Sequence, residues 1–327
     1  MKDPFGYIAG LLDKKVSRKK FLAMALSSIG LFLLSGFRPH KASAAAPEGS
    51  TGRLKKAIKT DHDLIVASGS DPYAMTVKAV EMIGGMERFV KKGDVVLVKP
   101  NIGWDRTPEQ AGNTNPQVVA ALVDMSLKAG AKKVKVFDIT CNESRRCYAT
   151  SGIGPAALKS GASVYHPEDW DTVKALFPFK SPMQGWPILR DAVECDVLIN
   201  APVLKHHGLT RLTLSMKNLM GVCGGNRGIM HQNIGENLVD LTGFMNPELT
   251  VIDAYRVLVR HSPTGGNLSD VNDVKKVIVA ADPTLADIVA CNIAGVEPSD
   301  VPYVRTAIQR KFGLTDPSKA DILNITV

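Results

Sequence analysis

The sequence predicts an α/β fold, a largely parallel sheet that is covered by helices on both faces. Two observations lead to this prediction. Short apolar runs rich in Val, Ile and Leu alternate along the chain with longer segments of helical periodicity. Several of these helical segments also begin and end with residues that helices favour at their termini. Alternating strands and helices are typical of a parallel sheet with both faces buried.

The predicted strands are short runs of mostly apolar, often β-branched residues. In chain order they lie at residues 63–68, 94–99, 133–138, 195–204, 249–253 and 275–280. Because apolar residues dominate most of these runs, we expect helices to cover both faces of the sheet.

Three predicted helices share one start signal and one stop signal. A capping residue followed by proline begins each helix, and a glycine ends it. The start pairs are Asp71-Pro72, Asn115-Pro116 and Asp282-Pro283, and the glycines are Gly84, Gly130 and Gly295. Caps, periodicity and stop signals agree with one another, which supports the predicted fold class.

The first 44 residues have the pattern of an export signal. Basic residues precede the apolar run 21–34, and small residues at 42–44 provide a cleavage site. Residues 17–22 resemble the twin-arginine export motif, with Lys19 in place of the second arginine. The twin-arginine route and the general secretory route therefore both stay open.

These patterns divide the chain into three parts. We predict an export signal peptide at residues 1–44, a linker at 45–62, and an α/β domain of one or two lobes at 63–327. The expected location is the periplasm or another exported compartment after removal of the signal. An uncleaved membrane anchor is the alternative.

The positive charge of the chain is concentrated in the signal. The formal net charge is +8, and residues 1–44 contribute eight basic and two acidic side chains, or +6. The remainder therefore carries +2, and it shows no basic stripe of the kind that nucleic-acid binding requires. We expect no nucleic-acid partner and membrane contact only through the signal segment.

Five cysteines are present, and no two of them are spaced as C-x-x-C. Zinc ribbons and ferredoxin-type clusters use such spacing, so we expect no iron–sulfur cluster. Outside the cytoplasm, Cys141 and Cys147 could form a disulfide across a loop. The sequence alone does not determine the pairing.

Polar residues follow the predicted strand 94–99, at the end where parallel sheets bind ligands. Lys99 ends this strand and Asn101 follows it, and a lysine there can bind a carboxylate or a phosphate. We predict that both residues bind substrate, although Lys99 could equally extend into solvent. Asp138 ends the next strand and is a weaker candidate, because such residues are common in turns.

The densest group of polar residues follows strand 195–204. Lys205, Lys217 and Asn218 could bind an anionic substrate, and Lys217 could also act as a nucleophile. His206 and His207 could serve as acid or base, and only one of them should face a given pocket, because adjacent residues of a strand point apart. We predict three catalytic residues, namely His206, His207 and Lys217, and we predict Lys205 and Asn218 as substrate-binding residues.

Acidic residues at later strand and helix ends complete the predicted site. Asp253 ends strand 249–253 and is expected to bind substrate or to orient a histidine. Asp287 could join His207 and His231 as ligands of a metal ion of unknown identity.

Several segments together resemble the family known as domain of unknown function 362. They are residues 95–101, 114–138, 196–221, 251–253 and 281–287, and they contain in order the motifs K-P-N, K-x-H, K-N-x-x-G and D-P. The resemblance covers most of residues 63–295. Some members of that family carry a ferredoxin-like cysteine segment, which this sequence lacks.

Three residues are also similar to a pattern in the lactate racemase family. His207, Lys217 and His231 occur in the family's order, and the ten-residue interval from His207 to Lys217 matches. Ser215 and Met216 stand where the family has glycines. The resemblance implies that Lys217 holds a nickel-pincer nucleotide covalently and that the histidines bind nickel or transfer protons.

These observations predict an exported α/β enzyme that binds an anionic small molecule at strand ends. A metal or a covalent cofactor with racemase-like chemistry is the finer hypothesis. Two alternatives stay open, because a fold does not define a function. The first is a periplasmic anion-binding or carrier module without catalysis, and the second is an accessory protein of a redox complex.

Overall fold

The computed structural model describes residues 49–54, 58–167 and 171–327. The predicted export signal lies outside the described residues, and so does part of the predicted linker. Within the described part of the chain, no helix combines the length and the apolar character needed to cross a membrane.

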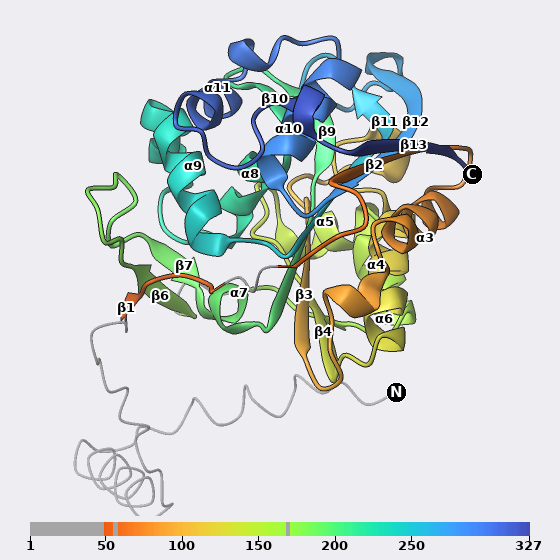
Figure 1. Cartoon of the computed structure of the whole chain (residues 1–327), viewed down its shortest axis with the longest axis horizontal. Coiled ribbons are helices and arrows are strands. Elements are labelled where there is room, and N and C mark those ends of the chain that lie inside the picture. The colour runs from red at the N-terminus through yellow and green to blue at the C-terminus, as the bar shows by residue number, and fades with distance from the viewer. Residues whose placement is uncertain (1–48, 55–57, 168–170) are drawn as a thin grey trace, which may run out of the picture. The chain divides into compact units, whose positions relative to one another are not determined.

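A ten-stranded sheet forms the centre of the fold (Figure 1). Its main path runs in the order β13 (Ile322–Thr326), β2 (Leu64–Ser68), β12 (Val271–Ala280), β11 (Leu249–Leu258), β8 (Val197–Ala201), β3 (Val95–Pro100), β4 (Lys133–Val136) and β5 (Ser163–Val164). Neighbouring strands on this path are parallel, except that β12 is antiparallel to both β11 and β2. The predicted fold class, a largely parallel sheet, is confirmed.

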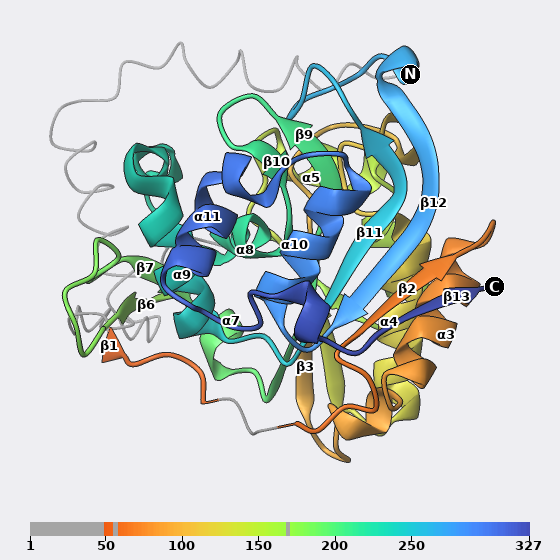
Figure 2. The same ribbon diagram turned by 45° about the horizontal axis from the view of Figure 1, so that its top comes forward.

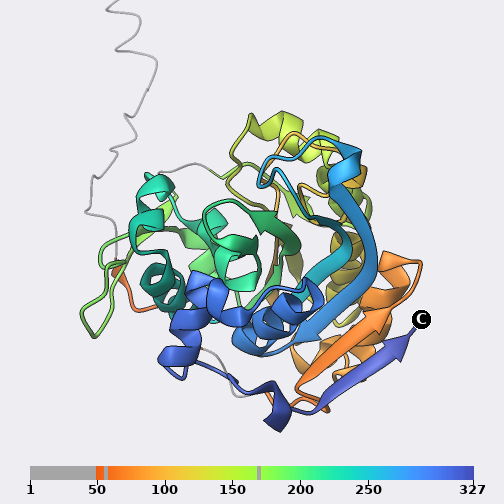
Figure 3. The ribbon, with the colours of Figure 1, turned by 90° about the horizontal axis from the view of Figure 1, so that it is seen from above.

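Helices cover both faces of this sheet, as predicted. One group comprises α3 (Pro72–Met82), α4 (Pro116–Lys128), α5 (Ser144–Thr150) and α6 (Ile153–Lys159), and the other comprises α8 (Ser215–Asn218), α9 (Ile234–Met245), α10 (Pro283–Ile293) and α11 (Pro302–Gln309). Figure 3 shows the yellow and orange helices of the first group and the teal and blue helices of the second on opposite sides of the strands. Each group packs on its own hydrophobic core, because successive strand residues face opposite sides. Leu97 of β3 belongs to one core, and its neighbours Val96 and Val98 belong to the other.

A small second sheet lies at the edge of the second helix group. It contains β1 (Gly49–Ser50), β6 (Thr172–Ala175) and β7 (Pro187–Leu189), and α7 (Arg190–Glu194) leads from it to β8. Phe177, just after β6, packs against Phe244 of α9 with ring centroids 5.5 Å apart and the rings tilted by 44°. The sequence did not predict this sheet, because its strands are too short to give a periodic signal.

The predicted helix caps are confirmed. The side chains of Asp71, Asn115 and Asp282 each accept hydrogen bonds from backbone N–H groups in the first turn of the helix that follows. The glycines after the three helices have φ angles of 119°, 100° and 66°, in the left-handed region that favours glycine.

The predicted strand 195–204 is two strands, because Pro202 interrupts it. Proline has no N–H to donate to a neighbouring strand. Beyond it the chain still pairs with β11, but its other neighbour changes from β3 to β10 (Arg211–Thr213). The first part is β8, and the second is β9 (Val203–His207), which pairs with β11 and with β10. Lys205, His206 and His207 therefore lie on a strand and not in a loop that follows one.

This change of partner opens a crevice at the carboxyl ends of the central strands. β3 pairs in parallel register with β4 on one side and with β8 on the other. β9 continues alongside β11 (Figure 2). Parallel α/β sheets bind ligands in such a crevice.

Candidate functional site

A cavity of about 850 Å³ lies at this crevice. Its wall includes the loop after β3, the loop after β4, β9, α8 and two 3-10 turns, η3 (Leu219–Val222) and η4 (Arg227–Asn233). Its polar lining residues are Asn101, Asp138, Cys141, Lys205, His207, Thr213, Lys217, Asn218, Asn226, Arg227 and His231. The cavity has the size of a typical small-molecule or cofactor site.

Six of the predicted site residues line this cavity, and four do not. The six are Asn101, Lys205, His207, Lys217, Asn218 and His231, and the four are Lys99, His206, Asp253 and Asp287. His207 faces the cavity and His206 does not, as the alternation of side chains along a strand predicts. Nδ1 of His206 is buried and has no hydrogen-bond partner among the described residues.

A buried ion pair lies beneath the cavity, where β3 and β4 end. Lys99 Nζ lies 2.7 Å from Asp138 Oδ1, and Lys99 is fully buried. The Asp138 Oδ2 atom accepts a hydrogen bond from the N–H of Ile102 at 2.7 Å. Lys99 therefore pairs with Asp138 in the interior and does not line the cavity, and its contact with substrate stays a prediction.

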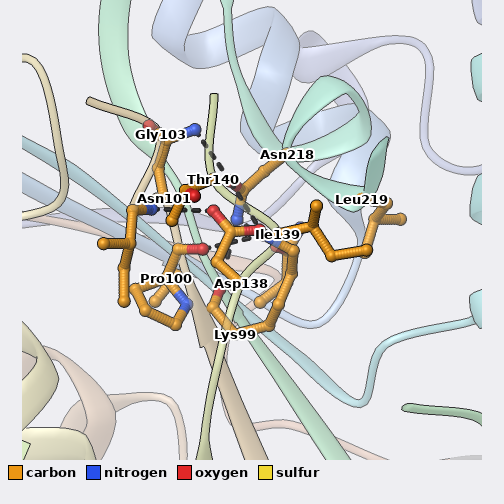
Figure 4. Close-up of polar contacts among 12 residues, drawn as sticks. Lys99, Pro100, Asn101, Gly103, Asp138, Ile139, Thr140, Asn218 and Leu219 are labelled. Carbon is orange, nitrogen blue, oxygen red and sulfur yellow. Dashed lines mark hydrogen bonds and ion pairs between the residues drawn. The ribbon is translucent and has the colours of Figure 1, made fainter. Parts of the chain in front are cut away.

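Asn218 connects this ion pair to the cavity wall. Its Oδ1 atom accepts hydrogen bonds from Lys99 Nζ at 3.3 Å and from Asn101 Nδ2 at 3.1 Å. Its Nδ2 atom donates to the carbonyl oxygen of Lys99 and to Asn200 Oδ1. Figure 4 shows the side chains of Lys99, Asp138 and Asn218 directed toward one another. The end of β3 and helix α8 thus share one polar network.

Gly221 is required for this arrangement. The ion pair lies so close to its backbone that a Cβ atom at this position would overlap Asp138 Oδ1 and lie 2.7 Å from Lys99 Nζ. Only glycine leaves room for the two charged groups.

Lys205 is a buried cation on the β9 wall. Its Nζ atom donates to the carbonyl oxygen of Gly112 at 2.6 Å and lies 3.4 Å from Asn101 Oδ1 and from the carbonyl oxygen of Pro263. Burial lowers the pKa of Lys205 to about 7, because desolvation disfavours its charged form.

Lys217 is a second buried cation, and it is only 8% exposed. Its Nζ atom lies 3.3 Å from His231 Nε2 and 3.4 Å from the Met220 sulfur. Burial lowers the pKa of Lys217 to about 8. A third cation, Arg227, donates to the carbonyl oxygens of Ile139 and Thr140, both at 2.9 Å.

None of these three cations has a carboxylate partner among the described residues. The carboxylate that lines the cavity, Asp138, is occupied by Lys99 and by the Ile102 N–H. The cavity wall therefore carries excess positive charge.

The two cavity histidines are held in opposite tautomers. His207 Nδ1 accepts from the backbone N–H groups of Leu209 and Thr210, so the proton of the neutral ring lies on Nε2. His231 Nδ1 lies 3.2 Å from the carbonyl oxygen of Gly228, which can only accept, so its Nε2 atom carries a lone pair. The rings are nearly parallel, with centroids 6.0 Å apart.

Both histidines are neutral at neutral pH. Burial, followed by the charge of Lys217, lowers the pKa of His207 to about 3. The same two causes lower the pKa of His231. The cavity thus presents one imidazole N–H donor and one imidazole lone pair.

The predicted metal group does not assemble. Asp287 accepts backbone hydrogen bonds from Ser215 and Met216 and does not line the cavity. Over residues 49–54, 58–167 and 171–327, no group of three or more His, Cys, Asp or Glu side chains is placed to hold a metal ion. The hypothesis that His207, His231 and Asp287 bind a metal is corrected, because the Asp287 carboxylate is directed to the start of α8.

Asp253 is likewise a buried structural carboxylate. It accepts from the N–H of Asn115 at 2.7 Å and from the N–H of Tyr255 at 3.0 Å. Burial raises the pKa of Asp253 to about 6, and these hydrogen bonds oppose the rise. It joins β11 to the start of α4 and does not line the cavity, and its contact with substrate stays a prediction.

The sequence did not identify Trp104, Cys141 and Arg227 as site residues, although all three line the cavity. Trp104 lies in the long loop after β3, and loops of this length at strand ends often carry function. The suggested disulfide is absent, because Cys141 and Cys147 are both free. Cys147 is buried in α5, and Cys141 is exposed.

We expect Gly221→Ala to destabilise the protein by at least about 3 kcal/mol, because it would displace a buried ion pair. Gly208→Ala is the matched control, since Gly208 also lines the cavity but has its nearest neighbouring atom 3.9 Å from the new Cβ position. Urea unfolding of both variants checks this expectation. Equal stability of the two variants would contradict it.

We expect Lys217→Met to stabilise the protein, and to do so more at low pH. The pKa of Lys217 is about 8 in the folded state and 10.5 ordinarily, so the folded state binds fewer protons between these values. The full free-energy cost of burying the charged Lys217 therefore applies below about pH 8. This cost declines as the pH rises to about 10.5. Replacement should add about 3 kcal/mol to the free energy of unfolding near pH 6.5 and about half as much near pH 9.5. Urea unfolding at both pH values, with exposed Lys132→Met as control, tests this, and a gain independent of pH would contradict it.

Comparison with known proteins places the chain in a family. Residues 96–292 match the family described as domain of unknown function (DUF362). A thylakoid-associated protein of Synechocystis sp. is 28% identical over 253 residues, which cover 74% of this chain and 75% of that protein.

Two solved structures are more distantly similar. The lactate racemase apoprotein from Thermoanaerobacterium thermosaccharolyticum has a TM-score of 0.42 at 14% identity and matches over 78% of this chain and 61% of its own. A protein from Thermotoga maritima has a TM-score of 0.34 at 12% identity, over 69% of this chain and 60% of its own. The chain thus matches about three-fifths of the length of each structure. By the match over residues 96–292, this protein belongs to the DUF362 family.

Proposed function

We propose that this protein is an enzyme that binds an anionic small molecule in the cavity at the strand ends. The observation that carries the proposal is the excess positive charge of the wall. Lys205, Lys217 and Arg227 face one cavity without a carboxylate partner among the described residues, and Asp138 is already paired with Lys99.

Unpaired buried cations are costly, because they lose the hydration that stabilises their charge. Burial is the largest cause of the low pKa of both lysines, and carboxylates that could offset it do not contact them. A bound carboxylate or phosphate would restore this charge balance through charge-assisted hydrogen bonds. The free cavity is therefore suited to an anion.

The histidines favour an enzyme over a carrier that lacks catalysis. His207, which lines the cavity, carries its proton on Nε2, and His231 Nε2 has a lone pair 3.3 Å from Lys217 Nζ. The two stacked, neutral rings present one donor and one acceptor. Such a pair can deliver a proton to a bound substrate and remove a proton from it. The Lys217 amine lies 3.3 Å from His231 Nε2 and is partly deprotonated near neutral pH, and such an amine can act as a nucleophile.

The cavity also fits a cofactor attached to Lys217, as the resemblance to lactate racemases predicts. The Lys217 amine has no carboxylate partner among the described residues, and a volume of about 850 Å³ leaves room for a cofactor beside a small acid. When bound, a nickel-pincer nucleotide would supply the metal that the described side chains do not hold by themselves. Export of this enzyme stays a prediction that rests on residues 1–44.

We expect at least one of lactate, succinate, citrate and inorganic phosphate to bind, as measured by isothermal titration calorimetry. Lys217→Met should weaken that binding at least about tenfold, whereas exposed Lys132→Met should not change it. Affinity should fall as the pH rises from about 6.5 to 8.5, because Lys205 and Lys217 lose their protons in this range. Parental affinity in the Lys217→Met variant would exclude Lys217 from the site.

We expect the protein purified from its own host to carry extra mass on Lys217. Intact-mass and peptide mass spectrometry locate the modification, and elemental analysis identifies a bound metal. Extra mass on Lys217 together with a metal would support a covalent cofactor. An unmodified Lys217 and no bound metal would exclude the covalent cofactor and leave only the proposed anion site.

A further inference from the structure

Helix α8 carries Lys217 and Asn218 but lacks a cap of its own. Leu214 occupies its N-cap position and cannot accept a hydrogen bond from the first turn through its side chain. The helix spans only Ser215–Asn218, and so short a helix is not stable by itself. Its orientation must come from contacts with other elements.

Asp287 of α10 supplies the missing cap. Its Oδ1 atom accepts from the N–H of Ser215 at 2.7 Å, and its Oδ2 atom accepts from the N–H of Met216 at 3.1 Å. The Ser215 hydroxyl donates to the carbonyl oxygen of Pro283, also on α10, at 3.1 Å. Both carboxylate oxygens thus hold the first turn of α8.

This cap places a carboxylate in the protein interior. Asp287 is fully buried and has no cationic partner among the described residues. The titratable groups around it are Asp282 and Cys291 on its own helix and Tyr303 on α11. Burial raises its pKa to about 7, so this group would be an unfavourable choice for stability alone.

We propose that Asp287 is a positioning residue, which holds the Lys217 amine in the cavity by capping α8 from α10. This inference rests on the proposed function of Lys217, but the cap holds α8 in the protein without a ligand as well. Because Asp287 fixes the first turn, Lys217 follows within the same turn and stays buried beside His231. Loss of the cap should let α8 fray and admit water to Lys217.

The test compares Asp287→Asn with Asp253→Asn in the full chain. Asp253 is also buried and accepts two backbone hydrogen bonds, but it holds the start of α4 and not the start of the helix that carries Lys217. Each variant removes the charge of one buried, backbone-capping carboxylate. The pKa of Lys217 should change in Asp287→Asn and not in Asp253→Asn, and this difference separates positioning from a general effect on stability.

The measurement is the pH profile of Lys217 acetylation by acetic anhydride, quantified by peptide mass spectrometry. It uses protein whose intact mass shows that Lys217 is unmodified. We expect the parent to have a midpoint near pH 8. Asp287→Asn should raise the midpoint by about one pH unit, because solvent favours the charged amine. Asp253→Asn should leave it unchanged, and Asp287→Glu should restore part of the parental profile.

A parental profile in Asp287→Asn would overturn the proposal, and so would an equal rise in Asp253→Asn. If Asp287→Asn does not fold, Ser215→Pro replaces it, because proline suits a first helical position and removes one donor to Asp287. No change of the Lys217 midpoint in that variant would also overturn the proposal. Acetylation needs no ligand, so a failure of anion binding in the parent would reject the proposed function separately.

Discussion

The buried ion pair between Lys99 and Asp138 is the contact on which the rest of the site depends. It joins the ends of two parallel strands, and Asn218 extends it to the helix that carries Lys217. Burial lowers the pKa of Lys99, and the negative charge of Asp138 opposes this effect. Removing either partner would leave an uncompensated charge in the interior, which typically costs about 3 to 5 kcal/mol. The pair therefore fixes the strand ends before any ligand binds.

The same pair determines the charge of the cavity. Asp138 lines the cavity and could balance the positive charge of its wall. Its two oxygens, however, already bind Lys99 and a backbone N–H. The cations on the wall are left without a carboxylate partner in the described part of the chain. A folded protein keeps such an arrangement at a cost in stability, and functional sites commonly carry this kind of cost.

The sequence predicted the fold well and the site in part. Strand runs and Asp-Pro or Asn-Pro caps are local signals, and local signals survive in the structure. Residue type and a position near a strand end identified Lys217 and His231, among others. The same reasoning did not show that Lys99 pairs with Asp138 or that Asp287 caps α8, because a strand-end lysine and a helix aspartate look alike in sequence whether they face a ligand or another element.

The sequence by itself determined the alternation of strands and helices, where three helices begin and end, and that lysines and histidines cluster after β8. Only the tertiary structure decided which of those side chains meet. Pro202 redirects the chain, β9 changes partner, and Lys205 and His207 then face Lys217 across one cavity. These are contacts between residues far apart in sequence, and pairing between strands sets them, so no local pattern can specify them.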